Sequence, residues 1–353
     1  MSTTTADAST ELDLVKLGDH LSLALPDGIT GTLSADLIAG GRSNPTYRLT
    51  DGEQVWVLRR PPYGHVLPSA HDMRREFTVI DALQGTAVPV PAAIHLCEDE
   101  SILGASFYLM DMVDGVGVGT VEQARTLDAA DRRRLGFELA DTLAALHDID
   151  PHSVGLSEFG RPHGYLERQL RRWEQQWQAS SLTCRPEADL LLGKLGRALP
   201  QRSVHGIVHG DVKLDNVLVS ASDRGRIVAV LDWEMATLGD TLADVGVMLS
   251  FWDTAGIPHH PITRGLATLE GFPSRTEMLE RYALARGIDL PDVDWYIVFA
   301  DLKIAIIMEG IAARHARGET VGDGFEGVSD MAEPLMQRAL DLASRSTVPE
   351  LRR

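Results

Sequence analysis

The 353-residue chain has a formal charge of −18 at pH 7, from 51 acidic and 33 basic side chains, and 44% of its residues are hydrophobic. The length allows two lobes around a sizeable core, and the composition is that of a folded globular protein. The acidic charge argues against a nucleic-acid partner, because such binding needs basic stripes that neutralise phosphates. A nucleotide would therefore have to be held by local cations, a metal ion and backbone N–H groups.

The sequence carries no signal for export, for a membrane span or for disulfides. Its opening residues are polar and lack a basic stretch before an apolar one, so we expect no signal peptide. The most apolar late segment, Trp295 to Ala312, contains three charged side chains and is predicted to be a buried helix. The two cysteines, Cys97 and Cys184, lack a CxxC spacing, so they suggest neither a disulfide framework nor a structural zinc site. A reducing cytoplasm fits best.

Residues 31–113 are predicted to form a small antiparallel β lobe with one main helix, preceded by a tail and a leading helix over residues 1–30. This lobe contains short β-rich runs that are broken by Gly and Pro. The first run ends at Ile38, the next two are Tyr47 to Leu49 and Val55 to Arg60, and the last is SFYLMDMV. The segment HDMRREFTVIDAL is predicted to be a helix whose apolar face carries Met73, Phe77, Ile80 and Leu83.

Residues 114–353 are predicted to form a larger, mostly helical lobe, so the fold class is α+β with two lobes. Leucines recur at helical spacing in DRRRLGFELADTLAALHDID, and HGYLERQLRRWEQQW is amphipathic. Further helices are expected over Thr276 to Arg286 and Trp295 to Arg314. The one clear β interruption is VLVS and RIVAVLDW around ASDRG, which is typical of a hairpin.

The strongest functional signal is HGDVKLDN, His209 to Asn216, followed by the hairpin and by Asp232. Phosphoryl transfer needs a carboxylate that accepts the proton of the acceptor hydroxyl, and ligands for a metal that holds the phosphates. The kinase catalytic loop places its base five positions before a metal-binding Asn, and Asp211 and Asn216 have this spacing. Asp232 stands where the second metal carboxylate belongs, and Lys213 is placed to neutralise charge on the moving phosphoryl group.

These segments, extended to HGDVKLDNVLV and RIVAVLDWEMATLGDTLADVG, resemble the aminoglycoside phosphotransferase family of the protein-kinase-like fold. The resemblance extends more weakly from about Gly31 to Arg314. Within that family, LRRPPYGHVLPSAHDMRREF and LDWEMATLGDTLAD are similar to the subgroup found beside, or fused to, acyl-CoA dehydrogenases. Some members of this phosphotransferase subgroup are implicated in phosphorylating hydroxyacyl-CoA compounds.

The resemblance implies a kinase-like two-lobed fold, with ATP and Mg²⁺ as cofactors. It implies that Asp211 is the catalytic base and that Asn216 and Asp232 are the Mg²⁺ ligands. His209 would be a structural member of the loop. Asp240 and Asp244 match a GDxxxD segment that resembles a brace for the catalytic loop, with the carboxylates accepting N–H or Arg donors.

In the small lobe, GGRSNPT is a turn between strands that could lay backbone N–H groups over phosphates, with candidate residues Gly40, Gly41, Ser43 and Asn44. The turn departs from GxGxxGxV, and a Gly-rich turn between strands can also be purely structural. In kinases a strand Lys holds the phosphates and pairs with a helix Glu. Arg59 takes the matching position, with Glu76 as its partner, although a planar guanidinium does not replace an ammonium group like for like. A surface Arg on an edge strand is the alternative.

The run FYLMDMV matches the hinge between kinase lobes, where backbone groups of Asp111, Met112 and Val113 could pair with adenine, and a buried strand explains it equally well. His147 is predicted to be a satisfied core or capping histidine. Three arginines lie close together on a predicted helix: Arg168, Arg171 and Arg172. We expect them to form a solvated face, and contacts with a phosphorylated substrate are the alternative. Trp252 is expected in the core, and helix-surface charge is expected of Asp253, Glu309 and Arg314.

The pattern as a whole predicts a phosphotransferase acting on the hydroxyl of a small molecule: a hydroxyacyl-CoA, another metabolic alcohol or an aminoglycoside. A protein kinase is disfavoured because Trp233 and Glu234 follow Asp232 without DFG, APE or a long activation segment. A flavin-dependent dehydrogenase is disfavoured because the motifs serve phosphate and metal. A catalytically silent, ATP-binding regulatory protein is the alternative. The choice of ATP or GTP, and of monomer or homodimer, stays open.

Overall fold

The computed structural model describes residues 12–38, 44–62, 72–180, 185–256, 258–290, 292–318 and 327–353. The chain divides into two compact units. The small unit comprises Met1–Asp114 together with Leu231–Glu234, and the large unit comprises Gly115–Val230 together with Met235–Arg353.

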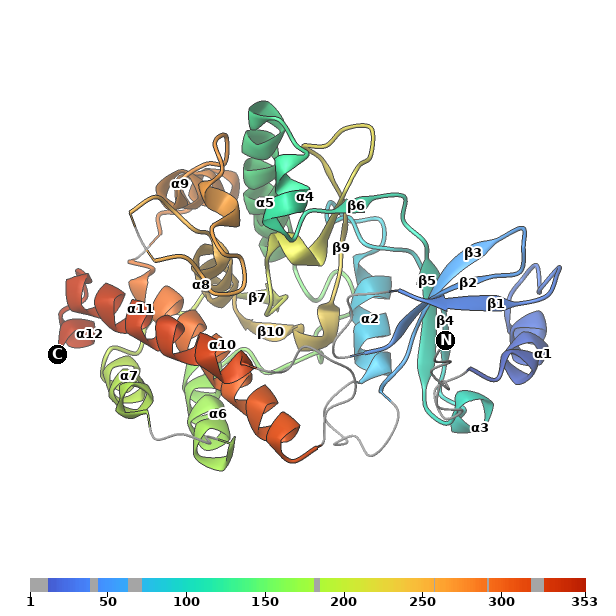
Figure 1. Ribbon diagram of the computed structural model, residues 1–353, viewed down its shortest axis with the longest axis horizontal. Coiled ribbons are helices and arrows are strands. Elements are labelled where there is room, and N and C mark those ends of the chain that lie inside the picture. Colours follow the sequence, from blue (N-terminus) through green and yellow to red (C-terminus); the bar gives the residue numbers. More distant parts are fainter. Residues whose placement is uncertain are drawn as a thin grey trace, which may run out of the picture. The chain divides into compact units, whose positions relative to one another are not determined.

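The small unit is built on a five-stranded antiparallel sheet, in the order β1-β2-β3-β5-β4 (Figure 1). The strands are β1 (Ser34–Leu37), β2 (Thr46–Thr50), β3 (Val55–Arg59), β4 (Ala93–Cys97) and β5 (Phe107–Asp111). Helix α1 (Leu14–Ala24) packs its buried leucines against this sheet, and the short α3 (Glu100–Leu103) follows β4. The predicted antiparallel β lobe is thus present, with β4 as a strand that the sequence analysis did not identify.

Helix α2 (Met73–Leu83) is the predicted main helix of the small unit. It begins where the side chain of Asp72 accepts the N–H of Arg75 at 3.0 Å. Its buried face carries Met73, Glu76, Val79, Ile80 and Leu83, residues separated by three or four positions. Phe77 was predicted on this face but is only partly buried, because the row of buried side chains runs through Glu76 beside it.

The large unit is mainly helical, as predicted. Its longer helices are α5 (Ala129–Asp148), α6 (Tyr165–Ser180), α7 (Pro186–Arg197), α8 (Leu242–Phe251), α9 (Arg275–Arg286), α10 (Asp294–Ala316) and α11 (Ala332–Arg345), and its short helices are α4 (Val121–Arg125) and α12 (Pro349–Arg352). Helix α10 packs against α6, α8 and α11, which confirms the predicted buried helix. Among the described residues, no helix is long and apolar enough to cross a membrane.

Two small sheets interrupt these helices. One has the order β6-β8-β9, with β6 (Val116–Gly117), β8 (Val217–Val219) and β9 (Ile227–Val230), and it contains the predicted hairpin. The other pairs β7 (His205–Val208) with β10 (Thr237–Asp240), two strands that the sequence analysis did not identify. Strand β7 leads into HGDVKLDN and β10 leads into α8, so this second sheet fixes the start of the loop described next.

Candidate active site

The loop between β7 and β8 holds the predicted base. Oδ2 of Asp211 accepts hydrogen bonds from Nζ of Lys213 at 2.7 Å and from Nδ2 of Asn216 at 2.9 Å. Nδ2 of Asn216 also donates to the backbone oxygen of Asp211 at 2.8 Å, which closes the loop on itself. The structure thus brings together the three residues of this loop to which the sequence assigns chemical roles.

Buried side chains hold the loop from the core of the large unit. The two carboxylate oxygens of Asp244 accept the N–H groups of His209 at 2.6 Å and of Gly210 at 2.7 Å. Nζ of Lys303 donates to the carbonyl oxygen of Gly210 at 2.7 Å. Gly210 has a φ of 89°, and a Cβ there would lie 2.8 Å from that of Met235, so the turn requires glycine. The backbone before Asp211 is therefore fixed on both sides.

A histidine anchors this brace in turn. His147 lies between Asp244 and Tyr282, with Nε2 3.3 Å from a carboxylate oxygen and Nδ1 2.7 Å from the hydroxyl, as expected of a satisfied core histidine. Burial lowers the pKa of His147 despite the carboxylate beside it. Burial would raise the pKa of Asp244, but His147 and the loop N–H groups outweigh it and lower that pKa. Asp240, the other predicted brace, accepts instead from the hydroxyl of Tyr296 at 3.2 Å.

The carboxylate of Asp211 is held in its ionised form. Burial alone would raise the pKa of Asp211, but the ammonium group of Lys213 and, less strongly, that of Lys303 outweigh burial and keep this pKa below its usual value. A carboxylate that is ionised and fixed by two donors can accept a proton without first having to reorient.

A second charged cluster lies within the small unit, centred on Arg59. Nε of Arg59 lies 2.8 Å from Oε2 of Glu76, the helix partner predicted from the sequence, and Nη2 lies 2.6 Å from Oδ1 of Asp232. Glu76 also accepts hydrogen bonds from Tyr108 and from Asn44, each at 3.0 Å. Strand β3 lies between β2 and β5, and the Arg59 side chain is 12% exposed, so the alternative of a surface Arg on an edge strand is wrong.

The two sides of this cluster differ in their electrostatics. Burial raises the pKa of Glu76, and the guanidinium of Arg59 only partly opposes that effect. Burial would lower the pKa of Arg59, but the carboxylates of Glu76 and Asp232 outweigh it and raise that pKa. One guanidinium thus serves two carboxylates. When both carboxylates are ionised, the three side chains together have one net negative charge.

Asp232 adopts a backbone conformation that side chains rarely tolerate. Its φ is 65°, and in the described part of the chain only one other non-glycine residue has a positive φ. Such conformations concentrate at functional sites, where the surrounding structure enforces them. The chain reaches Asp232 from β9, in which Val230 pairs with Val217, the residue after Asn216.

The family model of the Phosphotransferase enzyme family, APH, matches residues 34–280. The chain belongs to this family. The resemblance seen in HGDVKLDN and the segments around it is therefore confirmed, and so is the protein-kinase-like fold, with an antiparallel amino-terminal sheet and a mostly helical carboxyl-terminal part.

The curated relatives of this APH chain include much longer proteins. It is 35% identical to acyl-CoA dehydrogenase family member 11 of Rattus norvegicus over 351 residues, which are 96% of this chain and 44% of the relative. It is 32% identical to acyl-CoA dehydrogenase family member 10 of Mus musculus over 324 residues, which are 90% of this chain and 30% of the relative. The chain thus spans less than half the length of these relatives.

Two solved structures show the fold of the family. A candidate aminoglycoside phosphotransferase of Ralstonia eutropha superposes with a TM-score of 0.80 and 31% identity, covering 96% of this chain and all of its own. The aminoglycoside phosphotransferase APH(4)-Ia, solved with AMP-PNP and hygromycin B, has a TM-score of 0.59 and 16% identity, covering 88% of this chain and 93% of its own. The second likeness shows a shared fold alone.

The predicted phosphate-binding turn of this APH chain is described only at its end. Asn44 is buried, and its Nδ2 donates to Glu76 at 3.0 Å and to Glu234 at 3.1 Å, so its amide belongs to the Arg59 cluster. Its role toward a nucleotide stays a prediction. The other three candidates lie outside the described residues: Gly40, Gly41 and Ser43.

The predicted adenine-binding stretch begins as a buried strand and ends in solvent. Strand β5 is buried up to Met110, whereas Asp111 and Met112 are exposed and Val113 is partly buried. The buried-strand interpretation of FYLMDMV therefore holds as far as Met110. Nucleotide binding by Asp111, Met112 and Val113 stays a prediction.

A small apolar cavity of about 20 Å³ lies in the large unit beside the catalytic loop. Lys213 contributes to its wall, together with the apolar side chains of Leu139, Met248, Phe251 and Trp252. The ammonium nitrogen of Lys213 lies 5.2 Å from the ring centroid of Phe251. The sequence analysis placed Trp252 in the core, where it is 2% exposed, but it missed this cavity because every residue of α8 is buried and no single face of the helix stands out in the sequence.

Two acids predicted as helix-surface charge are buried, so those predictions are wrong. Asp253 is fully buried and accepts hydrogen bonds from the N–H of His260 and the hydroxyl of Thr263, each at 2.6 Å. Glu309 is fully buried and lies 2.7 Å from Nε of Arg185. The partners of Asp253 lie in the loop that follows α8, and the partner of Glu309 lies 124 residues away, so residue spacing along a helix reveals neither burial.

The remaining basic candidates behave as predicted. Arg314 is exposed near the end of α10, as surface charge should be. The arginines of α6 are likewise exposed and form a solvated face: Arg168, Arg171 and Arg172.

Proposed function

We propose that this chain transfers the γ-phosphoryl group of ATP to a hydroxyl group of an apolar small molecule, with Mg²⁺ as cofactor. The observation that carries the proposal is the catalytic loop, in which Asp211 is fixed by Lys213 at 2.7 Å and by Asn216 at 2.9 Å. Family membership and the order of the motifs along the chain support it.

In the proposed reaction, the acceptor oxygen attacks the γ-phosphorus, and the bond from that phosphorus to the β–γ bridging oxygen breaks, releasing ADP. The proton of the acceptor hydroxyl passes to the carboxylate of Asp211. Lys213 stabilises the negative charge that accumulates on the transferred group, because its ammonium lies in the same loop. The residues of the brace, Asp244 and Lys303, hold the loop without touching the reactants.

The donor groups of Asn216 and Asp232 fit a magnesium ion, which prefers carboxylate and carbonyl oxygens. Since Nδ2 of Asn216 donates to Asp211, its Oδ1 is the atom suited to a metal. Oδ1 of Asp232 pairs with Arg59, which leaves Oδ2 for coordination. When bound, the ion supplies charge neutralisation at the β- and γ-phosphates.

Arg59 is proposed to bind the nucleotide phosphates from the small unit. Its Nε pairs with Glu76, and its Nη2 pairs with Asp232 at 2.6 Å. A phosphate oxygen would take the place of Asp232 on Nη2, and Arg59 would keep its contact with Glu76. ATP is our choice because structures of the family contain AMP-PNP or ATP, although one family structure holds GDP.

The cavity beside Lys213 favours an apolar acceptor. An aminoglycoside carries several ammonium groups and needs acidic walls, whereas this cavity is lined mainly by aliphatic and aromatic side chains, with Asp215 as its one acid. At about 20 Å³ it admits only an end of an acceptor, such as a methyl-terminated chain. A hydroxyacyl compound fits this description, and the names of the acyl-CoA dehydrogenase relatives agree with it.

One observation favours the alternative of a catalytically silent nucleotide-binding protein. The 2.6 Å ion pair between Arg59 and Asp232 engages a carboxylate that phosphoryl transfer needs for the metal. A protein that never exchanges this pair would bind nucleotide and not turn it over.

An acceptor screen tests the proposal. Purified protein with Mg²⁺ and ATP is incubated with hydroxyacyl-CoAs of several chain lengths, with aminoglycosides and with amino alcohols, and ADP release is measured. We expect release with a hydroxyacyl compound and an added phosphoryl group in the product by mass spectrometry. Replacing ATP by GTP decides the nucleotide. The Asp211→Asn variant should be inactive, and Asp223→Asn, an acid of the next hairpin, should be active.

A chain that binds ATP but releases no ADP with any acceptor would instead support the silent alternative. Activity with aminoglycosides alone would overturn the choice of acceptor and leave the reaction class intact.

A further inference from the structure

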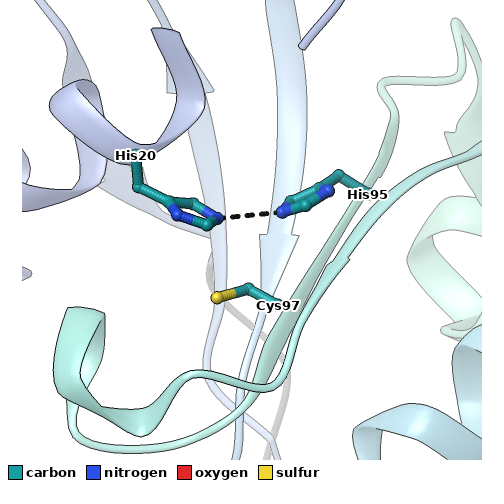
Figure 2. A group of neighbouring side chains, drawn as sticks. All are labelled: His20, His95 and Cys97. Carbon is teal, nitrogen blue, oxygen red and sulfur yellow. Dashed lines mark hydrogen bonds between the residues drawn. The ribbon is translucent and has the colours of Figure 1, made fainter. Parts of the chain in front are cut away.

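Three side chains of types that bind metals lie together in the small unit, on elements that serve no step of the proposed reaction. Among the described residues, His20, His95 and Cys97 form the one group of at least three His, Cys, Asp or Glu side chains in which all candidate ligand atoms lie within 4.8 Å of one another. Figure 2 shows His20 on α1 facing His95 across the space between helix and strand, with the sulfur of Cys97 beside them.

The three residues meet because of how α1 and β4 pack. His95 and Cys97 are two positions apart on β4, and therefore point to the same side of the strand. The pairing of β4 with β5 shifts register between Ala93 and His95, a type of irregularity that often re-aims a side chain. His20 precedes the buried Leu21 on α1, so it lies at the edge of the helix face that packs on the core.

The histidine pair already has the geometry of shared coordination. The two Nε2 atoms lie 3.0 Å apart and face each other, so the hydrogen bond between them holds a single proton. Two imidazole nitrogens on one tetrahedral zinc ion, with bonds of about 2.0–2.1 Å, lie about 3.3 Å apart. The nitrogen atoms would therefore have to separate by only a few tenths of an ångström, and the sulfur would have to approach them by about one ångström.

The surroundings are apolar on the side of Cys97, whereas His20 and His95 are partly buried. Cys97 is 3% exposed and belongs to the apolar core of the small unit, and the ring of Phe107 meets His20 edge-on at 6.2 Å. An apolar surround limits access of water and strengthens the bonds of a bound metal. Asp99 is turned away from this role, because its carboxylate caps α3 by accepting the N–H of Ser101 at 2.9 Å.

We propose that His20, His95 and Cys97 bind a divalent cation of the zinc class, with water in the fourth position. Two imidazoles and a thiolate are ligands that such borderline cations prefer, and that Mg²⁺ does not. On binding, the thiol of Cys97 releases its proton to solvent, and each imidazole offers the lone pair of Nε2 with its remaining proton on Nδ1. The ion would fasten α1 to β4 and so stabilise the small unit.

The site is independent of the proposed phosphoryl transfer. None of its residues belongs to the Arg59 cluster or to the catalytic loop, and its ligand set differs from the oxygen set proposed for Mg²⁺. Binding of Mg²⁺ at the oxygen ligands therefore should neither compete with nor depend on a zinc-class ion here.

Titration of the tag-free protein with Co²⁺, in the presence of excess Mg²⁺, tests the proposal, because a thiolate bound to Co²⁺ gives a charge-transfer band that oxygen ligands do not. We expect this band to saturate at one Co²⁺ per chain and to disappear on addition of Zn²⁺. The Cys97→Ser variant should lose it. The matched control is Cys184→Ser, the only other cysteine of the chain, which should keep it.

A second measurement guards against loss of folding in the Cys97 variant. Zn²⁺ should raise the melting temperature of the wild type by several degrees, and His20→Gln, at a partly buried position, should lose that rise while keeping its melting temperature without metal. Absence of the charge-transfer band, its persistence in Cys97→Ser, or an equal rise with Zn²⁺ in His20→Gln would each overturn the proposal.

Discussion

The loop that holds Asp211 in the large unit and the Arg59 cluster in the small unit each place a carboxylate against a cation, partly buried in the loop and fully buried at Glu76, with opposite results. In the loop, Lys213 and Lys303 together outweigh burial and lower the pKa of Asp211. In the cluster, burial prevails over Arg59 and raises the pKa of Glu76. The difference lies in the ratio of charges, because two ammonium groups serve one carboxylate in the loop.

In the cluster the ratio is reversed, since Arg59 is shared between Glu76 and Asp232. In the loop the positive charges therefore balance the carboxylate of Asp211. In the cluster a negative charge remains that a further cation could neutralise. This contrast supports the proposal that the base lies in the first region and a metal carboxylate in the second.

The largest effect is expected where the loop loses its base. Asp211→Asn should lower turnover by about 10²–10⁴-fold, the usual contribution of a general base, with little change in ATP affinity. Steady-state ADP release and equilibrium nucleotide binding measure the two quantities. Asp223→Asn in the next hairpin is the control and should match the wild type. Near-normal turnover of Asp211→Asn would remove this residue from the role of base.

A second change breaks the brace while leaving the loop residues in place. Asp244→Ala leaves the N–H groups of His209 and Gly210 buried without an acceptor, so the free energy of unfolding should fall by about 2–4 kcal/mol. Denaturant unfolding measures it, and turnover should fall as well because the loop loosens. Asp223→Ala, at an exposed pair with Arg134, should change stability by less than about 1 kcal/mol. Equal losses in the two variants would contradict the brace.

A third change sharpens the assignment in the small unit. Arg59→Lys keeps the positive charge but cannot serve Glu76 and a phosphate through a planar fork, so KM for ATP should rise about 10-fold, with kcat less affected. The control is Arg48→Lys on the neighbouring strand β2. An unchanged KM in Arg59→Lys would mean that Arg59 holds only the carboxylates and not the nucleotide.

These two regions also show what can be predicted from the sequence. Asp211, Lys213 and Asn216 lie within six residues of one another, so a local motif predicts both their identity and their contacts. The pair of Arg59 with Glu76 was predictable only through the analogy to kinases, because 17 residues separate them. The contact of Arg59 with Asp232 spans 173 residues, and nothing in the local sequence indicates it.

The same limit explains what the sequence analysis missed. His20 and His95 are 75 residues apart, and Cys97 has no nearby cysteine, so the usual spacing of metal ligands is absent. Asp253 and Glu309 are acidic residues whose burial the sequence does not indicate, because their hydrogen-bond partners come from the loop after α8 and from the distant Arg185. The apolar pattern identified α2, α5, α6, α9 and α10, since a continuous hydrophobic face is a local property, whereas α7, α8 and α11 were not predicted.

The smallest effect tests the electrostatic contrast directly, through two glutamates that respond to pH in opposite ways. Because burial raises the pKa of Glu76 above 4.5, its ionisation costs stability as pH rises from about 4.5, and Glu76→Gln removes that cost. The stability of Glu76→Gln relative to wild type should therefore increase with pH, by on the order of 1 kcal/mol per pH unit just above pH 4.5.

Glu277 is the opposite case, since hydrogen bonds from Ser274 and Arg133 lower its pKa to about 2. The stability that the ionised Glu277 contributes is fully present above pH 4.5 and is lost as pH falls toward 2. Glu277→Gln should therefore be less stable than wild type above pH 4.5, and the difference should vanish as pH falls toward 2. Because Glu277 is 38% exposed, that difference should be only about 0.5 kcal/mol. Unfolding free energies of the three proteins, measured from about pH 2 to about pH 8, give both trends. If Glu76→Gln lost stability with rising pH, as Glu277→Gln should on leaving its acid range, Arg59 would have to outweigh burial and hold Glu76 in its ionised form, and the electrostatic contrast with Asp211 would be lost.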